Sequence, residues 1–232
     1  MTIYTDTVFA PIDYDHKLQR LAGGNETEVY RSDDGRFVVK VKEELGGDWA
    51  VALAHAQEMR AAAERYAACL GERHSIPSYY LLARDSNGKV QVLAIQPLVQ
   101  AQPLYSLEYE KLSPAERHAL SVELDRVIRR ALRHYARHGE MPDLYGRTST
   151  GGVDRHRQRS WRQLPERMWS FLVERTLLQS HNLLWTGGAT GRAILVDYDF
   201  VRRSALYRAL YFLVRVMLFW RDRAVIFLRL RR

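Results

Sequence analysis

Short apolar runs separated by polar turns dominate the first 100 residues and predict β-strands. LQRLAGGNETEVYRS is followed by the turn Asp33-Asp34-Gly35 and the apolar run 37–41, so we expect two strands joined by a turn within 18–42. The alanine-rich segment Trp49–Leu70 then predicts a helix, because alanine has the highest helix propensity. SIPSYYLLARD and KVQVLAIQPLV flank the turn residues SNG and predict a second hairpin.

The second half of the chain has the period of an α-helix, with a clear start and end. Ser113, Pro114 and Glu116 form the pattern of a capping box, with Ser as the N-cap residue and Pro at the first helical position. Apolar residues recur at helical spacing as far as Gly139, a residue type that commonly ends helices. A further helix is predicted over 165–178, and HNLLWTGGATGRAILVDYDF predicts a hairpin.

Strands therefore come first and helices follow, with a polar stretch around Pro103 between them. This order predicts an α+β protein of two lobes, a small β-rich lobe over 1–100 and a helical lobe over 101–232. The chain of 232 residues is 47% hydrophobic and 27% charged, which is typical of a folded globular protein. The lone cysteine, Cys69, cannot form an internal disulfide, and the first residues lack a secretory apolar segment, so we expect a cytoplasmic protein.

The net charge of +8 is confined to the end of the sequence. Residues 201–232 contain nine arginines and one acid, Asp222, while the acidic and basic side chains of residues 1–200 balance. The same basic segment is dense in apolar and aromatic residues, which leaves three interpretations open. It is a helix packed on the second lobe with exposed arginines, a helix at an anionic membrane surface, or a nucleic-acid-binding segment. No nucleic-acid-reading motif accompanies the charge, so nucleic acid is the least favoured partner.

A glycine turn and a lysine on the following strand make up the first candidate site. Gly23 and Gly24 separate two strand-like runs, and Lys40 lies on the next strand. Backbone N–H groups of a glycine turn can approach phosphate oxygens, and a lysine on the next strand can reach the same phosphates. Lys40 would need a counter-ion if it is partly buried. The following helix offers Glu58 and Glu64, and the spacing favours Glu64.

Polar residues of the second half make up the second candidate site. Asn182 precedes an apolar run, and Asp197 directly follows the strand-like run 193–196. A carboxylate beside an amide oxygen is a suitable pair of ligands for Mg²⁺. Asp143 comes four residues after the predicted helix end, and Pro142 favours an extended chain that keeps Asp143 on a loop. A carboxylate there is a candidate base that would orient an attacking hydroxyl.

Taken in order, these segments resemble the protein-kinase-like superfamily. The sequence pattern is similar to that of aminoglycoside and choline phosphotransferases and of small bacterial sugar and lipopolysaccharide kinases. GGNETEVY resembles the glycine loop, FVVK the strand with the phosphate-binding lysine, and AIQPLV the hinge between lobes. HGEMPDLYG resembles the catalytic loop, and HNLL followed by LVDYDF resembles the metal-binding Asn and Asp pair.

The resemblance implies ATP and Mg²⁺ as cofactors and assigns roles to individual residues. Lys40 would bind phosphates and pair with Glu64, while Asp143 would orient the acceptor. Asn182 and Asp197 would hold Mg²⁺. The remaining nucleotide contacts would come from the glycine loop and the hinge, through Gly23, Gly24, Gln96 and Leu98.

One position of the resemblance separates two functions. The family usually places its catalytic Asp five residues before the metal-binding Asn, where this chain has Leu177. Asp143 can take the role only if residues 147–179 form an insertion inside the catalytic loop. We therefore expect either a phosphotransferase acting on a hydroxyl of an unidentified acceptor, or a non-catalytic kinase-like module that binds a nucleotide or a partner. Either protein would lie at the inner face of the membrane if the basic tail binds lipid.

Overall fold

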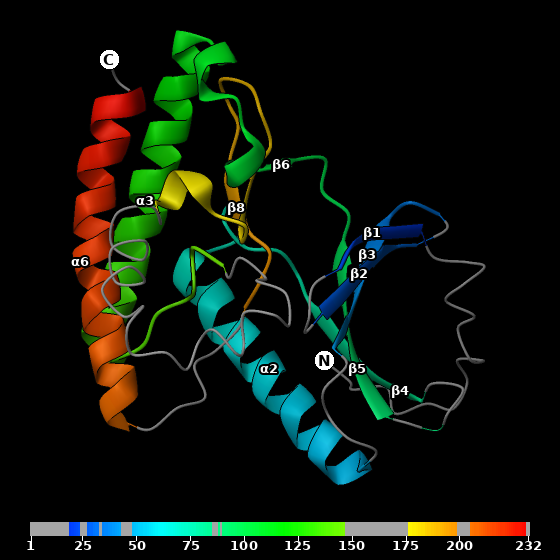
Figure 1. Cartoon of the computed structure of the whole chain (residues 1–232). Helices are drawn as coiled ribbons and strands as arrows, with labels where there is room; N and C mark the ends of the chain where they lie inside the picture. The colour runs from blue at the N-terminus through cyan, green and yellow to red at the C-terminus, as the bar shows by residue number, and fades with distance from the viewer. Residues whose placement is uncertain are drawn as a thin grey trace, which may run out of the picture. The chain divides into compact units, whose positions relative to one another are not determined.

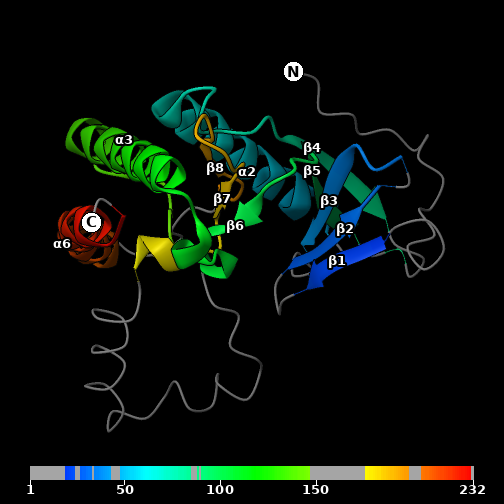
Figure 2. The same cartoon turned by 90° about the horizontal axis from the view of Figure 1, so that it is seen from above.

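The structure, a computed structural model, forms two compact units (Figures 1 and 2). It describes residues 19–23, 27–32, 34–42, 48–84, 88, 90–146, 176–198 and 205–230. Unit 1 contains the described residues as far as Glu64, together with Pro77–Val99. Unit 2 contains Arg65–Ile76 and the described residues from Gln100 onward. Gly24, most of the predicted insertion and most of the predicted helix 165–178 lie outside the described residues.

Unit 1 is built on an antiparallel sheet of five strands in the order β1-β2-β3-β5-β4. The strands are β1 (Gln19–Gly23), β2 (Thr27–Arg31), β3 (Phe37–Lys42), β4 (Tyr79–Arg84) and β5 (Val90–Pro97). Each strand pairs with its neighbour in an antiparallel register, with one irregularity between β1 and β2 at Arg20 and Ala22. Both hairpins predicted from the sequence are confirmed, but the segment 18–42 contains three strands, β1, β2 and β3, where two strands joined by a turn were expected.

One face of this sheet carries a small apolar core. Val39, Val41 and Leu93 are buried there, and Tyr30 and Ile95 pack against them. Residues that alternate with these along β3 and β5 point to the opposite face, since successive side chains of a strand lie on opposite sides.

Helix α2 (Trp49–Leu70) follows β3 and has the bounds that the alanine-rich segment predicts. Its last turns, from Arg65 onward, belong to unit 2. Small residues line its buried side, including Ala52, Ala56 and Ala62, which are fully buried. Small side chains allow a neighbouring backbone to approach closely, so the high alanine content also serves packing.

Unit 2 consists mainly of two long helices, α3 (Pro114–His138) and α6 (Ala205–Leu230), which pack side by side (Figure 1). The predicted start and end of α3 are confirmed. Ser113 and Glu116 form a complete capping box, and Gly139 ends the helix in the left-handed conformation with φ 69°. Tyr135 of α3 meets Phe212 of α6 with their rings 5.8 Å apart, so the predicted tail helix does pack on the second unit.

A small three-stranded sheet, in the order β6-β7-β8, completes unit 2. Strands β7 (Leu183–Trp185) and β8 (Ala193–Leu195) form the predicted hairpin, and β6 (Gln102–Pro103) joins its edge. The polar stretch around Pro103 was expected only to separate the two halves. It forms an edge strand instead, a position where proline is tolerated because one side of the strand needs no N–H donor. The α+β class, with a β-rich first unit and a mainly helical second one, is confirmed.

Candidate active site

Two segments that are distant in the sequence meet in unit 2 through hydrogen bonds. Ser180 Oγ donates to the carbonyl oxygen of Leu144 at 2.5 Å. Asn182 Nδ2 donates to the carbonyl oxygen of Asp143 at 2.9 Å. The chain therefore returns, just before β7, to the loop that follows α3. This meeting of the two segments is what an insertion over 147–179 requires.

The carboxylate of Asp143 is held from two sides. Its Oδ1 accepts hydrogen bonds from the backbone N–H groups of Tyr145 at 3.1 Å and of Gly146 at 3.4 Å, which closes a tight turn. The same oxygen lies 3.0 Å from Nη2 of Arg215, a residue of α6. The candidate base is therefore also one half of an ion pair whose two side chains are only 16% and 5% exposed.

Arg215 lies between two tyrosine rings. The centre of its guanidinium is 4.5 Å from the ring centroid of Tyr145 and 4.9 Å from that of Tyr211. Its Nη2 also donates to the Tyr211 hydroxyl at 2.6 Å. Burial lowers the pKa of Arg215, but Asp143 and the two tyrosines outweigh burial and raise that pKa above its ordinary value. The expectation that the arginines of this helix are exposed is therefore wrong for Arg215.

Gly146 allows Asn182 to reach the loop that contains Asp143. A Cβ atom at Gly146 would lie 2.6 Å from Asn182 Oδ1 and 2.9 Å from its Cγ, which is too close for any side chain. The φ angle of Gly146 is 74°, a value that favours glycine. Both the conformation and the close approach therefore require glycine at this position.

The β7–β8 hairpin brings Asn182 beside the segment that carries Asp197. The Val196 N–H donates to the carbonyl oxygen of Asn182 at 3.0 Å, which extends the pairing of β7 and β8 by one residue. On the other side of Asp197, the Tyr198 hydroxyl accepts from the Ile76 N–H at 2.7 Å and donates to the Ile76 carbonyl at 3.0 Å. The backbone is thus fixed directly before and after Asp197. Burial raises the pKa of Tyr198 to about 12, so its hydroxyl keeps its proton.

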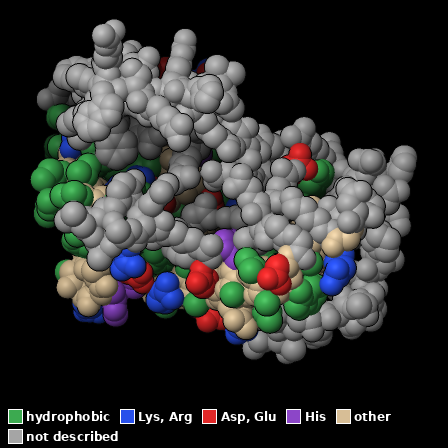
Figure 3. All heavy atoms as spheres, turned by 60° about the horizontal axis from the view of Figure 1, so that its bottom comes forward, with side chains coloured by type: hydrophobic (Ala, Val, Ile, Leu, Met, Phe, Trp, Pro, Cys, Tyr) green, Lys and Arg blue, Asp and Glu red, His purple; other side chains and the backbone are tan. Residues whose placement is uncertain are grey.

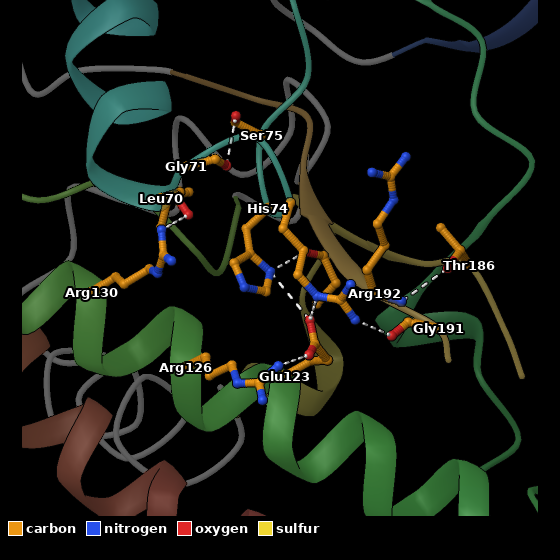
Figure 4. A network of polar contacts seen from close by, with 12 residues as sticks. Leu70, Gly71, His74, Ser75, Glu123, Arg126, Arg130, Thr186, Gly191 and Arg192 are labelled. Atoms are coloured by element: carbon orange, nitrogen blue, oxygen red, sulfur yellow. Dashed lines mark hydrogen bonds and ion pairs between the residues drawn. The ribbon is translucent and has the colours of Figure 1, made fainter. Parts of the chain in front are cut away.

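A polar network supports β8 from the side of α3 (Figure 4). His74 Nδ1 lies 2.9 Å from the carbonyl oxygen of Ala193, and Leu195 N–H donates to the carbonyl oxygen of His74 at 2.9 Å. The buried carboxylate of Glu123 lies 3.6 Å from the same His74 nitrogen and binds Arg73 Nε at 2.9 Å. Burial lowers the pKa of His74, so the neutral ring donates from Nδ1 to Ala193.

The segment before Asn182 is anchored to α6 by Asp222. Asp222 Oδ2 accepts the Leu177 N–H at 2.8 Å, and its Oδ1 lies 2.7 Å from Arg221 Nη2. Leu177 itself is fully buried, so it serves packing at the position where the resembling family has its catalytic Asp. Burial raises the pKa of Asp222, and the Arg221 guanidinium opposes this effect.

Lys40 lies on β3, the central strand of the sheet of unit 1. It stands opposite Val29 on β2 and opposite Ala94 on β5, and Ala94 in turn stands opposite Tyr80 on β4. Residues in direct register share a face of the sheet, and successive residues of a strand alternate between faces. Lys40 therefore lies on the face opposite Val39 and Val41, where it is half-buried. The predicted strand position of the lysine is correct, and Gly23 ends β1 at the predicted glycine turn.

The other predicted nucleotide contacts make different interactions. Glu64 Oε1 lies 2.8 Å from Nε of Arg60, one turn earlier on α2, because an exposed i,i+4 pair on a helix satisfies both charges locally. Gln96 is buried, and its Nε2 donates to Ser78 Oγ at 2.8 Å. The Leu98 N–H donates to the carbonyl oxygen of Arg36 at 2.7 Å. A hinge contact through that N–H would therefore require the hydrogen bond to Arg36 to break.

The oxygen ligands near the β7–β8 hairpin suit a hard cation that needs only one or two ligands from the protein. Asp197 offers a carboxylate and Asn182 an amide oxygen, and Mg²⁺ commonly takes one or two such protein ligands and completes its shell with water and phosphate oxygens. In the described part of the chain, no group of three or more His, Cys, Asp or Glu side chains could hold a metal ion.

Comparison with known proteins finds similarity in structure. No family model and no curated protein sequence matches the chain. The structure is similar to a double mutant of the Mycobacterium tuberculosis PknI kinase domain, with 12% identity, a TM-score of 0.41, and coverage of 78% of this chain and 57% of that one. It is also similar to the GDP and kanamycin complex of APH(2")-IIia, with 13% identity, a TM-score of 0.45, and coverage of 91% and 77%.

Three charged residues of the site were missed by sequence reasoning. Arg215 and Asp222 interrupt the apolar pattern of α6 and lie on the same side of the helix as the buried Phe219. A charge on the buried side of an amphipathic helix must find a partner. The place of these two residues within the apolar pattern was therefore the one signal in the sequence that they form buried polar contacts. Glu123 lies in the same way on the buried side of α3.

Proposed function

We propose that the protein is an ATP- and Mg²⁺-dependent phosphotransferase of kinase-like fold that acts on a hydroxyl group. The observation that carries this proposal is the hydrogen bond between Asn182 Nδ2 and the Asp143 carbonyl. It joins the loop of the candidate base to the candidate metal ligand. Phosphoryl transfer depends mainly on positioning and on stabilising charge, so a hydrogen bond that holds these two segments together supports the proposal.

The proposed roles follow the resemblance residue by residue. Asp143 would orient the acceptor hydroxyl, and Asn182 and Asp197 would hold Mg²⁺. The chemistry that Mg²⁺ supplies at such a site is neutralisation of charge on phosphate oxygens. Lys40 would bind the phosphates, and Glu64 or Glu58 of α2 would pair with Lys40.

The remaining nucleotide contacts would come from the glycine turn and the hinge. Gly23 and Gly24 would cover the nucleotide phosphates, and Gln96 and Leu98 would lie beside the base. The acceptor is a sugar, a lipid-linked or other small molecule, or a protein, and nucleic acid is not expected. The proposed location is the cytoplasm, at the inner face of the membrane, with residues 201–232 toward anionic lipid.

A second function is favoured by one contact of the same site and by one position of the sequence. The Asp143 carboxylate is engaged by Arg215 at 3.0 Å, and Leu177 occupies the usual position of the catalytic Asp. A protein with these features could bind a nucleotide without transferring phosphate. In that case it would act as a kinase-like module that signals through a partner.

Turnover distinguishes the two functions. Purified protein would be assayed for Mg²⁺-dependent ATP hydrolysis, together with Asp197→Ala, Asp143→Ala and the control Glu110→Gln, an exposed carboxylate of unit 2. We expect the control to retain wild-type rates and both alanine variants to lose at least about tenfold, because each lacks a group that acts on the reacting phosphate or hydroxyl. Equal rates in all four proteins would reject the assigned roles.

Nucleotide binding is measured separately by thermal unfolding with Mg²⁺-ATP. A ligand that binds the native state raises its stability by RT ln(1 + [L]/Kd), so the transition should rise with ATP concentration. A rise without turnover supports the non-catalytic module. If neither a rise nor turnover is seen, both functions are rejected.

A further inference from the structure

The outer side of α6 carries a continuous apolar stripe. Its members recur every three or four residues and therefore lie on one side of the helix. They are Leu210, Leu213, Met217, Trp220, Ala224, Phe227 and Leu228, all of them exposed. Met217 is 59% exposed and Trp220 is 58% exposed, although large apolar side chains are usually covered. The stripe spans about 27 Å along the helix at 1.5 Å per residue.

The opposite side of α6 accounts for the packing of the helix. Phe212, Leu218, Phe219, Ile226 and Leu230 are buried there. The stripe lies on the other side of the helix from these buried residues. In the view of Figure 3, hydrophobic side chains gather at the left edge, the side on which α6 lies in Figure 1. Contiguous exposed apolar surface of this kind marks an interaction site.

Two arginines lie at the borders of the stripe. Arg221 lies at one border, where its Nη2 is 2.7 Å from Asp222 Oδ1. Arg223 lies at the other border, where its guanidinium is 4.9 Å from the ring centroid of Trp220 and its Nε is 2.8 Å from Asp125 Oδ1. Arg208 and Arg229 are exposed near the two ends of the helix. The one acid of α6, Asp222, is turned inward to the Leu177 N–H and is 1% exposed. The outward side of the helix is thus apolar in the middle and basic at the borders.

This charge pattern selects the kind of partner. The carboxylates that pair with Arg221 and Arg223 are themselves largely covered, at 1% exposed for Asp222 and 17% for Asp125. A second copy of the chain would therefore bring arginines against arginines, and like charges in contact are unfavourable. A single convex helix offers no shaped pocket for a small ligand. Arginine and tryptophan beside an apolar sector are typical of helices that lie in the interface of an anionic bilayer.

We propose that α6 docks on anionic phospholipid through the stripe Leu210–Met217–Trp220–Phe227, with its bordering arginines on the lipid phosphates. This inference deepens the proposed membrane location by naming the surface and the lipid class. It needs no membrane span, and among the described helices none is long and apolar enough to cross a bilayer. Since ATP turnover is measured in solution, failure of lipid binding and failure of phosphoryl transfer are separate results.

The test is co-sedimentation of the full chain with vesicles. One set contains phosphatidylcholine with phosphatidylglycerol, and the other contains phosphatidylcholine alone. We expect binding to the anionic vesicles only, weakening as salt rises. Met217→Ser with Trp220→Ser should weaken binding at least about a hundredfold, because each of the two large apolar side chains moved out of water contributes a factor of about ten or more.

Matched variants separate a specific surface from general hydrophobicity. Val51→Ser with Tyr79→Ser removes two apolar side chains of unit 1 that are 51% and 49% exposed, and should leave binding unchanged. Ala224→Glu places an acid in the middle of the stripe and should abolish binding without disturbing buried contacts. Wild-type binding by the stripe variants, no binding by the wild type, or a dimer in sedimentation equilibrium that Ala224→Glu dissociates would each overturn the proposal.

Discussion

The guanidinium of Arg215 on α6 lies 3.0 Å from Oδ1 of Asp143, in the loop that follows α3. The contact ties the candidate base to a helix that contributes no other proposed reactive group. Because both side chains are largely buried, the pair interacts in a medium of lower dielectric than water. The position of the Asp143 carboxylate therefore depends on α6.

The first prediction concerns the strength of this pair. A double-mutant cycle with Arg215→Met and Asp143→Asn should give a coupling energy of about 1–3 kcal/mol in chemical unfolding, since buried partners in contact couple in this range. Arg215→Lys should recover only part of the loss, because an ammonium cannot stack between Tyr145 and Tyr211 as a planar guanidinium does.

The control for the cycle is Arg208, an exposed arginine of the same helix. Arg208→Met paired with Asp143→Asn should give additive changes in the free energy of unfolding. A coupling energy near zero for Arg215 and Asp143 would show that the ion pair does not hold the loop.

A second prediction uses two glycines with the same backbone conformation. Gly146 has φ 74° and Gly188 has φ 76°, but only at Gly146 would a Cβ meet a neighbour, at 2.6 Å from Asn182 Oδ1. Gly188→Ala should cost about 1–2 kcal/mol from the left-handed backbone alone. Gly146→Ala should cost at least about 1 kcal/mol more, because a crowded interior must shift.

The two glycine variants also separate the site from overall stability. Gly146→Ala displaces Asn182, so it should weaken Mg²⁺-dependent nucleotide binding in calorimetric titration, while Gly188→Ala should leave binding unchanged. Equal stability and equal binding in the two variants would contradict the close packing of Gly146 against Asn182.

Local patterns predicted most of the regular structure. The capping residues Ser113 and Glu116 and the terminal Gly139 fix α3 through interactions within a few residues, so the sequence alone identifies both ends. The edge strand at Gln102–Pro103 was missed because it exists only through its pairing with Trp185 and Leu184. Pairing between distant segments leaves little local trace in the sequence.

The site was predictable in part for the same reason. The roles of Asp143, Asn182 and Asp197 remain predictions from residue type and position, and the structure brings the segments of Asp143 and Asn182 together. Their supports could not be predicted in this way, because Arg215 and Asp222 act across long separations in the chain. Glu64 shows the opposite case, since a local i,i+4 partner, Arg60, competes with the distant lysine that was predicted.

A third prediction concerns the anchor of the segment before Asn182. Asp222→Ala removes the acceptor of the buried Leu177 N–H and the partner of Arg221, and should lower the free energy of unfolding by about 2–4 kcal/mol. Asp222→Asn keeps an acceptor oxygen and should cost less. Hydrogen exchange at the Leu177 amide is the local measurement. Unchanged protection in Asp222→Ala would contradict the anchor.

The last prediction is a dependence of stability on pH through His74. Its pKa in the folded protein is lowered below the ordinary value of 6.5 by burial, with Arg130 and Arg73 acting in the same direction and Glu123 opposing them. Above pH 6.5 the ring is neutral in both states and its stabilising contribution is complete. As the pH falls from 6.5 toward the folded pKa, the unfolded chain binds a proton that the folded protein does not, so stability is lost.

Replacement of His74 by asparagine isolates this effect. His74→Asn keeps a donor near the Ala193 carbonyl but cannot titrate. The free energy of unfolding of this variant should therefore fall less steeply from about pH 7 to about pH 5 than that of the wild type. The difference in slope should not exceed about 1.4 kcal/mol per pH unit, the limit for one proton. His118→Asn, at an exposed histidine of α3, is the control and should follow the wild type. If His74→Asn and His118→Asn have the same slope, His74 does not exchange a proton on unfolding in this range.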